Sequence, residues 1–239
     1  MSRPISCRGT LGDSFICMLK MYEKKDRYIV NHHTIHKYLW HQIAEIYSLI
    51  KNVEVRFVKE PRLDLEELTS DVHEQNMEFF PVFNIKQVAR TRVLEPYHII
   101  QPHSGKLLRG FNNKTLPISW VEDMILTEHN LGKKIVLVGT DPSYAHIGSC
   151  VNLIGKTTLK DTFSLINHAT TFTGIEGVLA FYALSQRKSS FIFYASKEAV
   201  ERRIEDSPWA KYAILTYISS YNDYIEMKKI WRHCESSSI

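Results

Sequence analysis

The sequence predicts an α/β protein built from two Rossmann-type domains, each with a parallel sheet, that face a cleft. Short apolar runs alternate with helical patterns, which is typical of βαβ units and of a parallel sheet. The alternation is interrupted at residues 87–96 by a polar and charged stretch that ends in proline, and it then restarts. The chain has 239 residues, of which 44% are hydrophobic and 23% charged, and this is enough for two small domains.

The first half of the chain predicts a domain at residues 1–90. Its clearest helix is residues 37–50, where Leu39, Ile43 and Ile46 recur at helical spacing. The run FFPVFNI at residues 79–85 contains a proline and therefore predicts an edge strand. The other expected elements are strands at residues 5–8, 27–33 and 53–58 and helices at residues 13–24 and 65–75.

The second half predicts a domain at residues 91–218, followed by a closing helix and tail at residues 219–239. Ligands of open parallel sheets bind outside the carboxyl ends of the strands, so we expect function in the loops that follow strands. The expected strands are residues 97–103, 133–139, 151–155, 170–174 and 190–196, and the expected helices are residues 118–130, 159–168, 176–186, 197–204 and 219–233.

Composition narrows the class of protein. The formal net charge of +4 mildly favours anionic partners such as a nucleotide, a nucleic acid or an anionic membrane. The four cysteines form no CxxC pair, which predicts reduced thiols rather than a zinc site or a disulfide framework. No apolar run reaches the roughly 18 residues of a membrane span, and the N-terminus lacks the apolar core of a secretory signal. We therefore expect a cytoplasmic protein without stable membrane insertion.

The first candidate loop is residues 9–13, GTLGD, which follows the first strand and opens a helix. Its two glycines allow a tight turn, and a helix N-terminus attracts anions. Asp13 could serve there as a general base, or it could simply cap the helix. The GxGxxG pattern is absent, which counts against a nicotinamide or flavin oxidoreductase.

The second candidate loop, residues 104–117, is basic and rich in small residues. Lys106, Arg109 and Lys114 accompany Ser104 and Gly105. Such a loop can hold a diphosphate through backbone amides and cationic side chains. The alternative is a solvated basic loop with no ligand.

Two shorter loops complete the candidates. Gly139 and Thr140 follow the strong strand at residues 133–139. Gly174 and Gly177 flank Glu176, whose carboxylate could accept hydrogen bonds from two neighbouring ribose hydroxyls. Either loop could also be an ordinary turn.

Metal ligation is not expected. His32, His33, His36 and His41 lie close together in the sequence, but no carboxylate spacing completes a metal site, and we interpret them as surface or core residues. An Asp-x-Asp motif, which would suit a metal-bridged sugar diphosphate, is absent. We therefore expect neither a metal nor a resident cofactor.

Several of these segments, in this order, resemble the heptosyltransferase-like glycosyltransferases of family nine, which have the GT-B fold. The stretch IIQPHSG…KTLPISWVEDMI resembles their strand, glycine loop, Lys-x-x-Pro segment and helix, and KKIVLVGTD resembles the next strand and turn. LIGKTTLKDTFSLINHATTFTG resembles their Gly-Lys-Thr-x-Leu segment leading to the nucleotide loop, and GTLGDSF resembles their Gly-x-x-Gly-Asp turn. The matches cover about half of the chain.

The resemblance implies metal-independent, inverting transfer of a sugar from a nucleotide sugar, which is a substrate, to an acceptor hydroxyl. Residues 1–90 would then form the acceptor side and residues 91–218 would bind the donor. Asp13 would be the base. The phosphates would be held by Ser104, Gly105 and Lys114, with additional contacts from Lys106 and Arg109. Thr158 and Leu159 would lie near the nucleotide base and Glu176 near the ribose, and the donor site would be completed by Gly12, Gly139, Thr140, Gly174 and Gly177.

The chain also departs from the family pattern. Where the family has Asp-Thr-Gly-Pro-x-His, this chain has residues 172–177, FTGIEG, so that the Asp, Pro and His are missing. Leu116 replaces the Trp of the Lys-x-Trp-Pro segment, and the chain is much shorter than a usual member. The donor or its contacts are therefore expected to differ, and a non-catalytic nucleotide-sugar-binding protein is an alternative.

Two acceptors remain open. One is a hydroxymethylated pyrimidine in phage DNA, which the compact length and positive charge of the chain slightly favour. This acceptor would imply that the protein acts in the host cytoplasm with double-stranded DNA as a partner. The basic pairs at residues 187–188, 202–203 and 228–229 could follow phosphates, although each is also compatible with ordinary solvated charges. The other acceptor is a surface or lipid-linked glycan of the lipopolysaccharide type.

Overall fold

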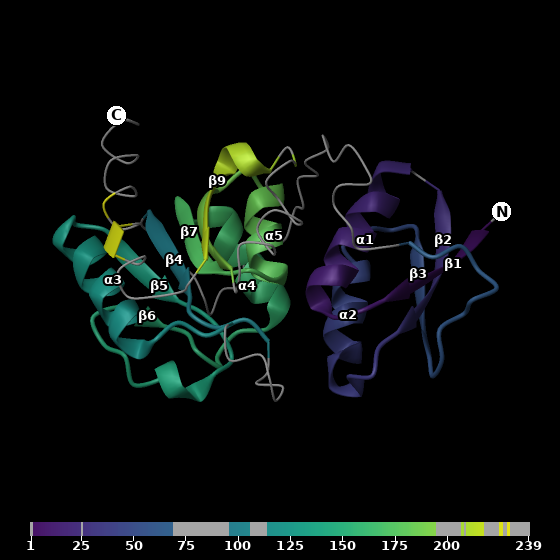
Figure 1. Cartoon of the computed structure of the whole chain (residues 1–239), viewed down its shortest axis with the longest axis horizontal. Coiled ribbons are helices and arrows are strands. Elements are labelled where there is room, and N and C mark those ends of the chain that lie inside the picture. The colour runs from purple at the N-terminus through teal and green to yellow at the C-terminus, as the bar shows by residue number, and fades with distance from the viewer. Residues whose placement is uncertain are drawn as a thin grey trace.

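The structure, a computed structural model, describes residues 2–24, 26–68, 96–105, 114–194, 207, 209–217, 225–226 and 229. Within these residues the strands form a three-stranded sheet of order β1-β2-β3 and a six-stranded sheet of order β6-β5-β4-β7-β8-β9. Every strand pair in both sheets is parallel. The two sheets form separate lobes with helices between them (Figure 1).

The three-stranded sheet alternates strands with helices. Its elements are β1 (Ser2–Arg8), α1 (Leu11–Lys24), β2 (Arg27–His33), a short 3-10 turn (Lys37–Leu39), α2 (Trp40–Tyr47) and β3 (Val53–Val58). β2 is the central strand, and its register places His32 between Cys7 of β1 and Phe57 of β3.

The six-stranded sheet follows the same alternation. Its elements are β4 (Tyr97–Gln101), α3 (Ile118–Asn130), β5 (Lys134–Leu137), a 3-10 turn (Pro142–Tyr144), β6 (Val151–Asn152), α4 (Leu159–His168), β7 (Thr171–Ile175), α5 (Val178–Ser185), β8 (Ser189–Tyr194), a second 3-10 turn (Ala210–Tyr212) and β9 (Ala213–Tyr217). The strands at residues 27–33 and 53–58 and the helices at residues 118–130 and 159–168 have the predicted bounds. At α4 the reason is local, because Thr158 and Asp161 form a capping box that sets the helix start.

Three expectations were wrong. The helix expected at residues 65–75 is not helical at residues 65–68; this segment instead runs beside the open edge of β1, where Ser6 N donates to Glu66 O and Leu68 N donates to Ser6 O, both at 2.8 Å. The helix expected to begin at Glu176 begins at Val178, because Glu176 N still donates to Phe193 O of β8 at 2.9 Å. β9 was not predicted at all.

Other expectations lie outside the described residues. They are the strand at residues 79–85, the helix at residues 197–204 and nearly all of the linker at residues 87–96. The domain bounds at residues 90 and 218 therefore stay predictions.

The layer between the sheets is made of helices that pack directly on one another. α1 and α2 cover one face of the three-stranded sheet, α4 and α5 cover one face of the six-stranded sheet, and α1 contacts α5 (Figure 1). Every residue of α5 from Leu179 to Ser185 is buried. A helix that is apolar all round requires such burial on all sides. α5 is therefore the element that joins the two lobes.

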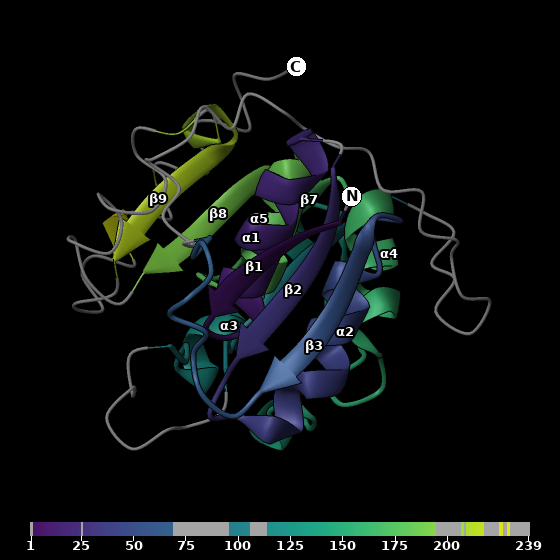
Figure 2. The same cartoon turned by 90° about the vertical axis from the view of Figure 1, so that its right-hand side faces the viewer.

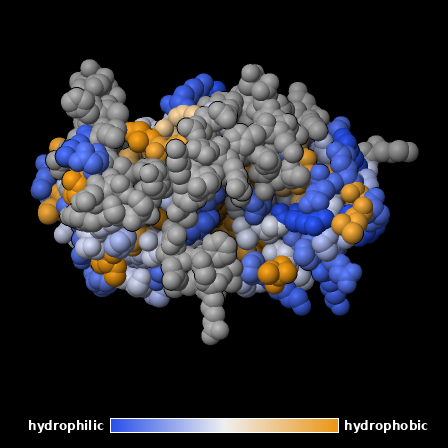
Figure 3. All heavy atoms as spheres, in the orientation of Figure 1, coloured by the Kyte–Doolittle hydropathy of each residue, from blue (hydrophilic) through white to orange (hydrophobic). Residues whose placement is uncertain are grey.

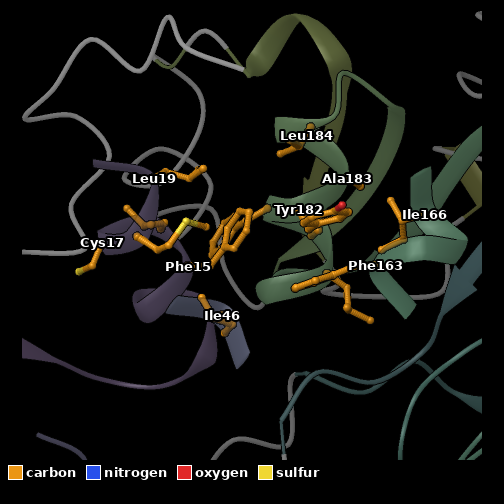
Figure 4. Close-up of a cluster of buried hydrophobic side chains, with 14 of the residues drawn as sticks. Phe15, Cys17, Leu19, Ile46, Phe163, Ile166, Tyr182, Ala183 and Leu184 are labelled. Atoms are coloured by element: carbon orange, nitrogen blue, oxygen red, sulfur yellow. The ribbon is translucent and has the colours of Figure 1, made fainter. Parts of the chain in front are cut away.

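Three aromatic rings form the centre of this helical layer (Figure 4). The rings of Phe163 on α4 and Tyr182 on α5 stack, with centroids 4.0 Å apart. Phe15 of α1 lies 5.8 Å from the ring of Tyr182 and 6.0 Å from that of Phe163. All three belong to one buried cluster that includes residues from both lobes. The two sheets thus share this cluster, while a second cluster lies around α3 in the lobe of the six-stranded sheet.

The strands of both sheets end on the same side of the molecule. Figure 2 shows the arrowheads of β2, β3, β8 and β9 pointing the same way. The loops that follow the strands of both sheets therefore gather at one end, where the sequence predicted function.

The surface of the described residues is mixed in character. On the face shown in Figure 3, orange side chains form small separate groups among blue ones where the surface is coloured. Large apolar side chains that remain exposed are Tyr22, Ile35, Tyr38, Leu63, Leu126 and Leu131. Among the described residues, no helix is both long enough and apolar enough to cross a bilayer.

The shared core predicts a large loss of stability when Phe15 is truncated. Phe15→Ala should lower the free energy of unfolding by about 3–5 kcal/mol, because it removes a fully buried ring that touches α4 and α5. The matched control is Leu63→Ala, since Leu63 is 81% exposed and should change stability by less than about 0.5 kcal/mol. Urea denaturation measures both, and equal effects of the two variants would contradict the shared core.

Candidate functional site

The order of the six-stranded sheet marks one point for ligand binding. The chain enters at β4, continues to one side through β5 and β6, and later returns to the other side through β7, β8 and β9. In open parallel sheets with such a reversal of strand order, ligands bind outside the carboxyl ends of the two strands at the reversal, which here are β4 and β7. Ser104 follows β4, and Glu176 and Gly177 follow β7.

These two loops touch through a serine and a glycine. A Cβ atom on Gly177 would lie 2.2 Å from Ser104 Oγ, so the absence of a side chain allows this approach. Ser104 N donates to Lys114 O at 3.1 Å, which closes the base of the basic loop. Gly105, at φ +88°, is the last described residue before the gap at residues 106–113, and the predicted phosphate contacts Lys106 and Arg109 lie in that gap.

Lys114 and Glu176 form an ion pair at the same point. Lys114 Nζ lies 2.6 Å from Glu176 Oε2, and the two side chains are 32% and 10% exposed. The sequence had assigned these residues to different parts of a ligand, phosphate for Lys114 and ribose for Glu176. The structure brings them together as one unit that offers a donor and an acceptor side by side.

Gly12 connects the other lobe to this point. A Cβ atom on Gly12 would lie 3.1 Å from the ring of Phe181 and 3.7 Å from Val178 N, the first residue of α5. The start of α1 therefore packs against the start of α5. As a result the GTLGD turn of the three-stranded sheet adjoins the loop after β7.

Asp13 is the third residue of α1, so it is not the N-cap residue, but its carboxylate does take part in capping the start of the helix. Its Oδ2 atom accepts hydrogen bonds from Thr10 N at 2.8 Å and from Thr10 Oγ1 at 3.1 Å. Gly9 adopts φ +115°, and a Cβ atom there would lie 2.4 Å from Asp13 Oδ2. Glycine is thus required at position 9 to make room for the carboxylate.

The remaining predicted donor residues form a neighbouring group after β5 and β6. Gly139, at φ +145°, accepts a hydrogen bond from Gly155 N at 2.8 Å. The hydroxyl of Thr158 donates to Asp161 Oδ2 at 2.8 Å and accepts from Asp161 N at 3.1 Å, so its local role is to start α4. Thr140 is exposed, Leu159 is the first residue of α4, and Gly174 lies within β7 against Gln101.

Polar residues link the two groups: His103, which is buried and was not predicted, and Asp141, which belongs to the same predicted loop as Gly139 and Thr140. His103 Nδ1 lies 3.2 Å from Thr115 Oγ1 and 3.9 Å from Asp141 Oδ2. Burial lowers the pKa of His103, although the charge of Asp141 opposes this. Burial alone would raise the pKa of Asp141, but the hydrogen bonds from Ser143 and the nearby His103 lower it. The signal in the sequence was a polar residue in the loop after each strand, since His103 follows β4 and Asp141 follows β5.

The described residues offer no group of three or more His, Cys, Asp or Glu side chains that could hold a metal ion. What they do offer at the switch point is one cation, one carboxylate, a hydroxyl and a glycine-lined helix start. Such an arrangement suits a polar ligand that carries hydroxyl groups.

Solved structures with this arrangement of elements are glycosyltransferases. E. coli heptosyltransferase WaaC with ADP has a TM-score of 0.59 at 9% identity, covering 98% of this chain and 99% of WaaC. The chain has the GT-B fold. A glycosyl transferase of family 9 from Veillonella parvula has a TM-score of 0.56 at 11% identity, covering 97% of this chain and 90% of that one. No family model and no characterised sequence matches the chain.

A longer protein shares this GT-B fold. The iron-containing dodecameric glycosyltransferase TibC from enterotoxigenic E. coli has a TM-score of 0.55 at 17% identity, covering 92% of this chain. This chain spans 64% of the length of TibC. At such identities the similarity establishes the fold, and the chemistry has to be argued from the residues of this chain.

Two of the residues that depart from the family pattern, Phe172 and Leu116, are packed in the interior of the protein. Phe172 stands where the family has Asp, and it is fully buried in β7 as part of the shared core. Leu116, in place of Trp, is also fully buried, and its carbonyl accepts a hydrogen bond from Tyr144 at 2.5 Å. The carboxylate at the end of β7 is instead that of Glu176, which reaches Lys114.

The ion pair predicts a measurable coupling between Lys114 and Glu176. A double-mutant cycle with Lys114→Met and Glu176→Gln should give a coupling free energy of about 1.5 kcal/mol or more. This is the usual size for a hydrogen bond to a charged group, and here the pair is partly shielded from water. The matched control is the pair Lys229 and Glu226, which has the same 2.6 Å separation but side chains 66% and 68% exposed. That pair should give about 0.2–1 kcal/mol. Equal coupling in both cycles, measured by urea denaturation, would contradict the partial burial of the site pair.

Proposed function

We propose that this protein is a glycosyltransferase that moves a sugar from a nucleotide sugar to an acceptor hydroxyl, with Asp13 as the base. The observation that carries the proposal is the packing of Gly12 against the start of α5. Asp13 follows Gly12 on α1, in the lobe of the three-stranded sheet, so this contact supports a position of its carboxylate near the switch point of the six-stranded sheet. Transfer between two bound substrates requires the base and the donor to be held close together in a productive geometry.

The proposed reaction is a single displacement. The acceptor oxygen attacks the anomeric carbon and forms a new C–O bond, while the bond from that carbon to the diphosphate breaks. The hydroxyl proton passes to Asp13, and the electron pair of the broken bond leaves with the nucleoside diphosphate. Attack opposite to the leaving group inverts the configuration at the anomeric carbon.

We place the donor at the switch point. The ammonium group of Lys114 and the hydroxyl of Ser104 are suited to a diphosphate. Glu176 holds Lys114 and can accept a hydrogen bond from a hydroxyl of the ribose or of the transferred sugar. We propose that Gly139, Thr158 and the residues beside them lie near the nucleotide base. The ion pair of Lys114 and Glu176 offers both a donor and an acceptor, which favours a ligand rich in hydroxyl groups.

We propose a glycan rather than DNA as the acceptor. Lys188, one of the cations considered for phosphate contact, donates through Nζ to Asn167 O at 2.7 Å and to Ala169 O at 2.8 Å. Its charge therefore serves the fold. The loop after β2, which adjoins the GTLGD turn through a 3.2 Å hydrogen bond from Gly9 N to His33 O, carries Tyr38, whose 50% exposed ring could pack on a sugar.

The base role predicts a specific effect of Asp13→Asn. The amide retains an oxygen that can accept from Thr10 N, so the turn should persist, but it cannot take the hydroxyl proton. Transfer should fall by about 10²–10⁴-fold. Binding of ADP should change little, because the donor residues lie on the other lobe. The control is Asp64→Asn, which alters an exposed carboxylate paired with Arg62.

The assay incubates the protein with a panel of nucleotide sugars and candidate acceptors and follows release of nucleoside diphosphate and transfer of sugar. Near-normal transfer by Asp13→Asn would remove Asp13 from the mechanism. Binding of nucleotide sugars without turnover by the unmodified protein, with any acceptor, would support a binding protein instead.

The choice of acceptor predicts how transfer responds to salt. Transfer to a glycan should change little between about 50 and about 200 mM salt, whereas DNA held through roughly three to five phosphates would lose about 10²-fold in affinity over that range. The measurement compares lipid-linked or surface glycans with hydroxymethylated and plain duplex DNA, followed by digestion to nucleosides and mass spectrometry. A mass increase confined to the hydroxymethylated base would show that the acceptor is DNA.

A further inference from the structure

His32 lies buried directly beneath the turn that carries Asp13. It is the penultimate residue of β2 and is fully buried, with its ring edge-on to Tyr47 of α2 at 5.8 Å and to Phe57 of β3 at 6.1 Å. Its Nε2 atom lies 3.3 Å from Gly9 O, and its Nδ1 atom lies 3.2 Å from the hydroxyl oxygen of Tyr47. Both ring nitrogens are therefore used inside the protein.

The chemistry of these partners determines the direction of both hydrogen bonds. A carbonyl oxygen can only accept, so Nε2 carries the proton that is donated to Gly9 O. Nδ1 then accepts from the Tyr47 hydroxyl. Burial lowers the pKa of His32, although the hydrogen bond to Gly9 and the charge of Asp13 oppose this. Burial also raises the pKa of Tyr47 well above its usual value, so the phenol keeps the proton that it donates.

The same peptide group that accepts from His32 donates to the carboxylate. The carbonyl of Gly9 and the N–H of Thr10 belong to one planar peptide unit, in which the oxygen and the hydrogen point in opposite directions. Thr10 N donates to Asp13 Oδ2 at 2.8 Å. A continuous relay thus runs from the Tyr47 hydroxyl through the imidazole and the peptide to the carboxylate.

Other hydrogen bonds also hold this turn, since Gly9 N donates to His33 O at 3.2 Å and Ser14 N donates to Thr10 O at 3.0 Å. The hydrogen bond from His32 Nε2 acts on the carbonyl side of the Gly9–Thr10 peptide. Gly9 has φ +115°, a conformation in which glycine keeps more freedom than any other residue. Rotation of the Gly9–Thr10 peptide would withdraw the N–H from Asp13. Hydrogen bonds in a chain also polarise one another in a buried setting, which strengthens the hold on the carboxylate.

We propose that His32, oriented by Tyr47, is a positioning residue that holds the Asp13 carboxylate in its reactive place through the Gly9–Thr10 peptide. This rests on the proposed function, because Asp13 is the base in that proposal. His32 does not touch the reacting atoms. Its removal should therefore lower the rate of transfer without changing donor affinity.

The test compares four variants in transfer kinetics and in ADP binding. His32→Phe keeps the aromatic ring but removes both nitrogens, and it should lower kcat by about 10–100-fold, the scale of an error of about 1 Å in the position of a catalytic group. Tyr47→Phe removes one hydroxyl and should lower kcat by less. His32→Gln retains an N–H that can reach Gly9 O and should recover much of the loss. The Kd for ADP should stay unchanged in all three.

The fourth variant, His98→Phe, is the matched control. His98 is also buried, lies on β4 and contacts Thr171, at the opposite end of the strand from the site. It should lower stability without the specific loss of kcat. An equal loss of kcat in His98→Phe and His32→Phe, or no recovery in His32→Gln, would overturn the proposal.

A readout independent of activity keeps this proposal separate from the function. In nitrogen-15 NMR spectra, His32 should be neutral with the proton on Nε2, and this tautomer should persist in Tyr47→Phe because Gly9 O still accepts from Nε2. A proton on Nδ1 in the unmodified protein would overturn the relay. Full activity of Asp13→Asn would refute the base itself, whereas an inactive Asp13→Asn with a fully active His32→Phe would refute only the role of His32.

Discussion

The burial of α5 between the two sheets is the constraint on which the rest of this structure depends. α5 is apolar on all sides, and its residues from Leu179 to Ser185 are buried against α1, α4, β7 and β8. Tyr182 completes an aromatic cluster with Phe15 and Phe163 from the neighbouring helices. Exposing this helix would return its whole apolar surface to water, so the hydrophobic effect holds the two lobes in contact. The relative position of the sheets follows from that contact.

Because α5 is held between the lobes, its first turn is also where the lobes meet at the functional end. Gly12 from one lobe and Ser104 and Gly177 from the other approach this point closely, and each contact depends on a missing side chain. The ion pair of Lys114 and Glu176 closes the same region. The polar site is therefore built at the edge of the apolar interface, where Glu176 is buried and its partner Lys114 is partly exposed.

The three-stranded sheet contributes a different kind of order. The penultimate residue of its central strand is His32, whose ring is packed between Tyr47 and Phe57 and whose nitrogens connect α2 to the GTLGD turn. Apolar packing of Gly12 on Phe181 of α5 restrains one end of the GTLGD turn. The hydrogen bond between His32 Nε2 and Gly9 O restrains the other end. The same lobe thus shares the core of the molecule through Phe15 and orients a carboxylate through His32, using residues from three separate elements.

The sequence by itself determined the parallel α/β class, the approximate positions of most described elements and the segments after strands in which Asp13, Ser104 and Glu176 lie, because periodicity, glycine turns and caps are local signals. Only the tertiary structure decided that Glu176 pairs with Lys114, that residues 65–68 run beside β1 instead of forming a helix, and that His32 supports the turn. Each of these depends on partners that are distant in the chain: 62 residues separate Lys114 from Glu176, and 23 separate His32 from Gly9. A local pattern carries no information on such pairings, since each arises only when its own sheet and the loops around that sheet have folded.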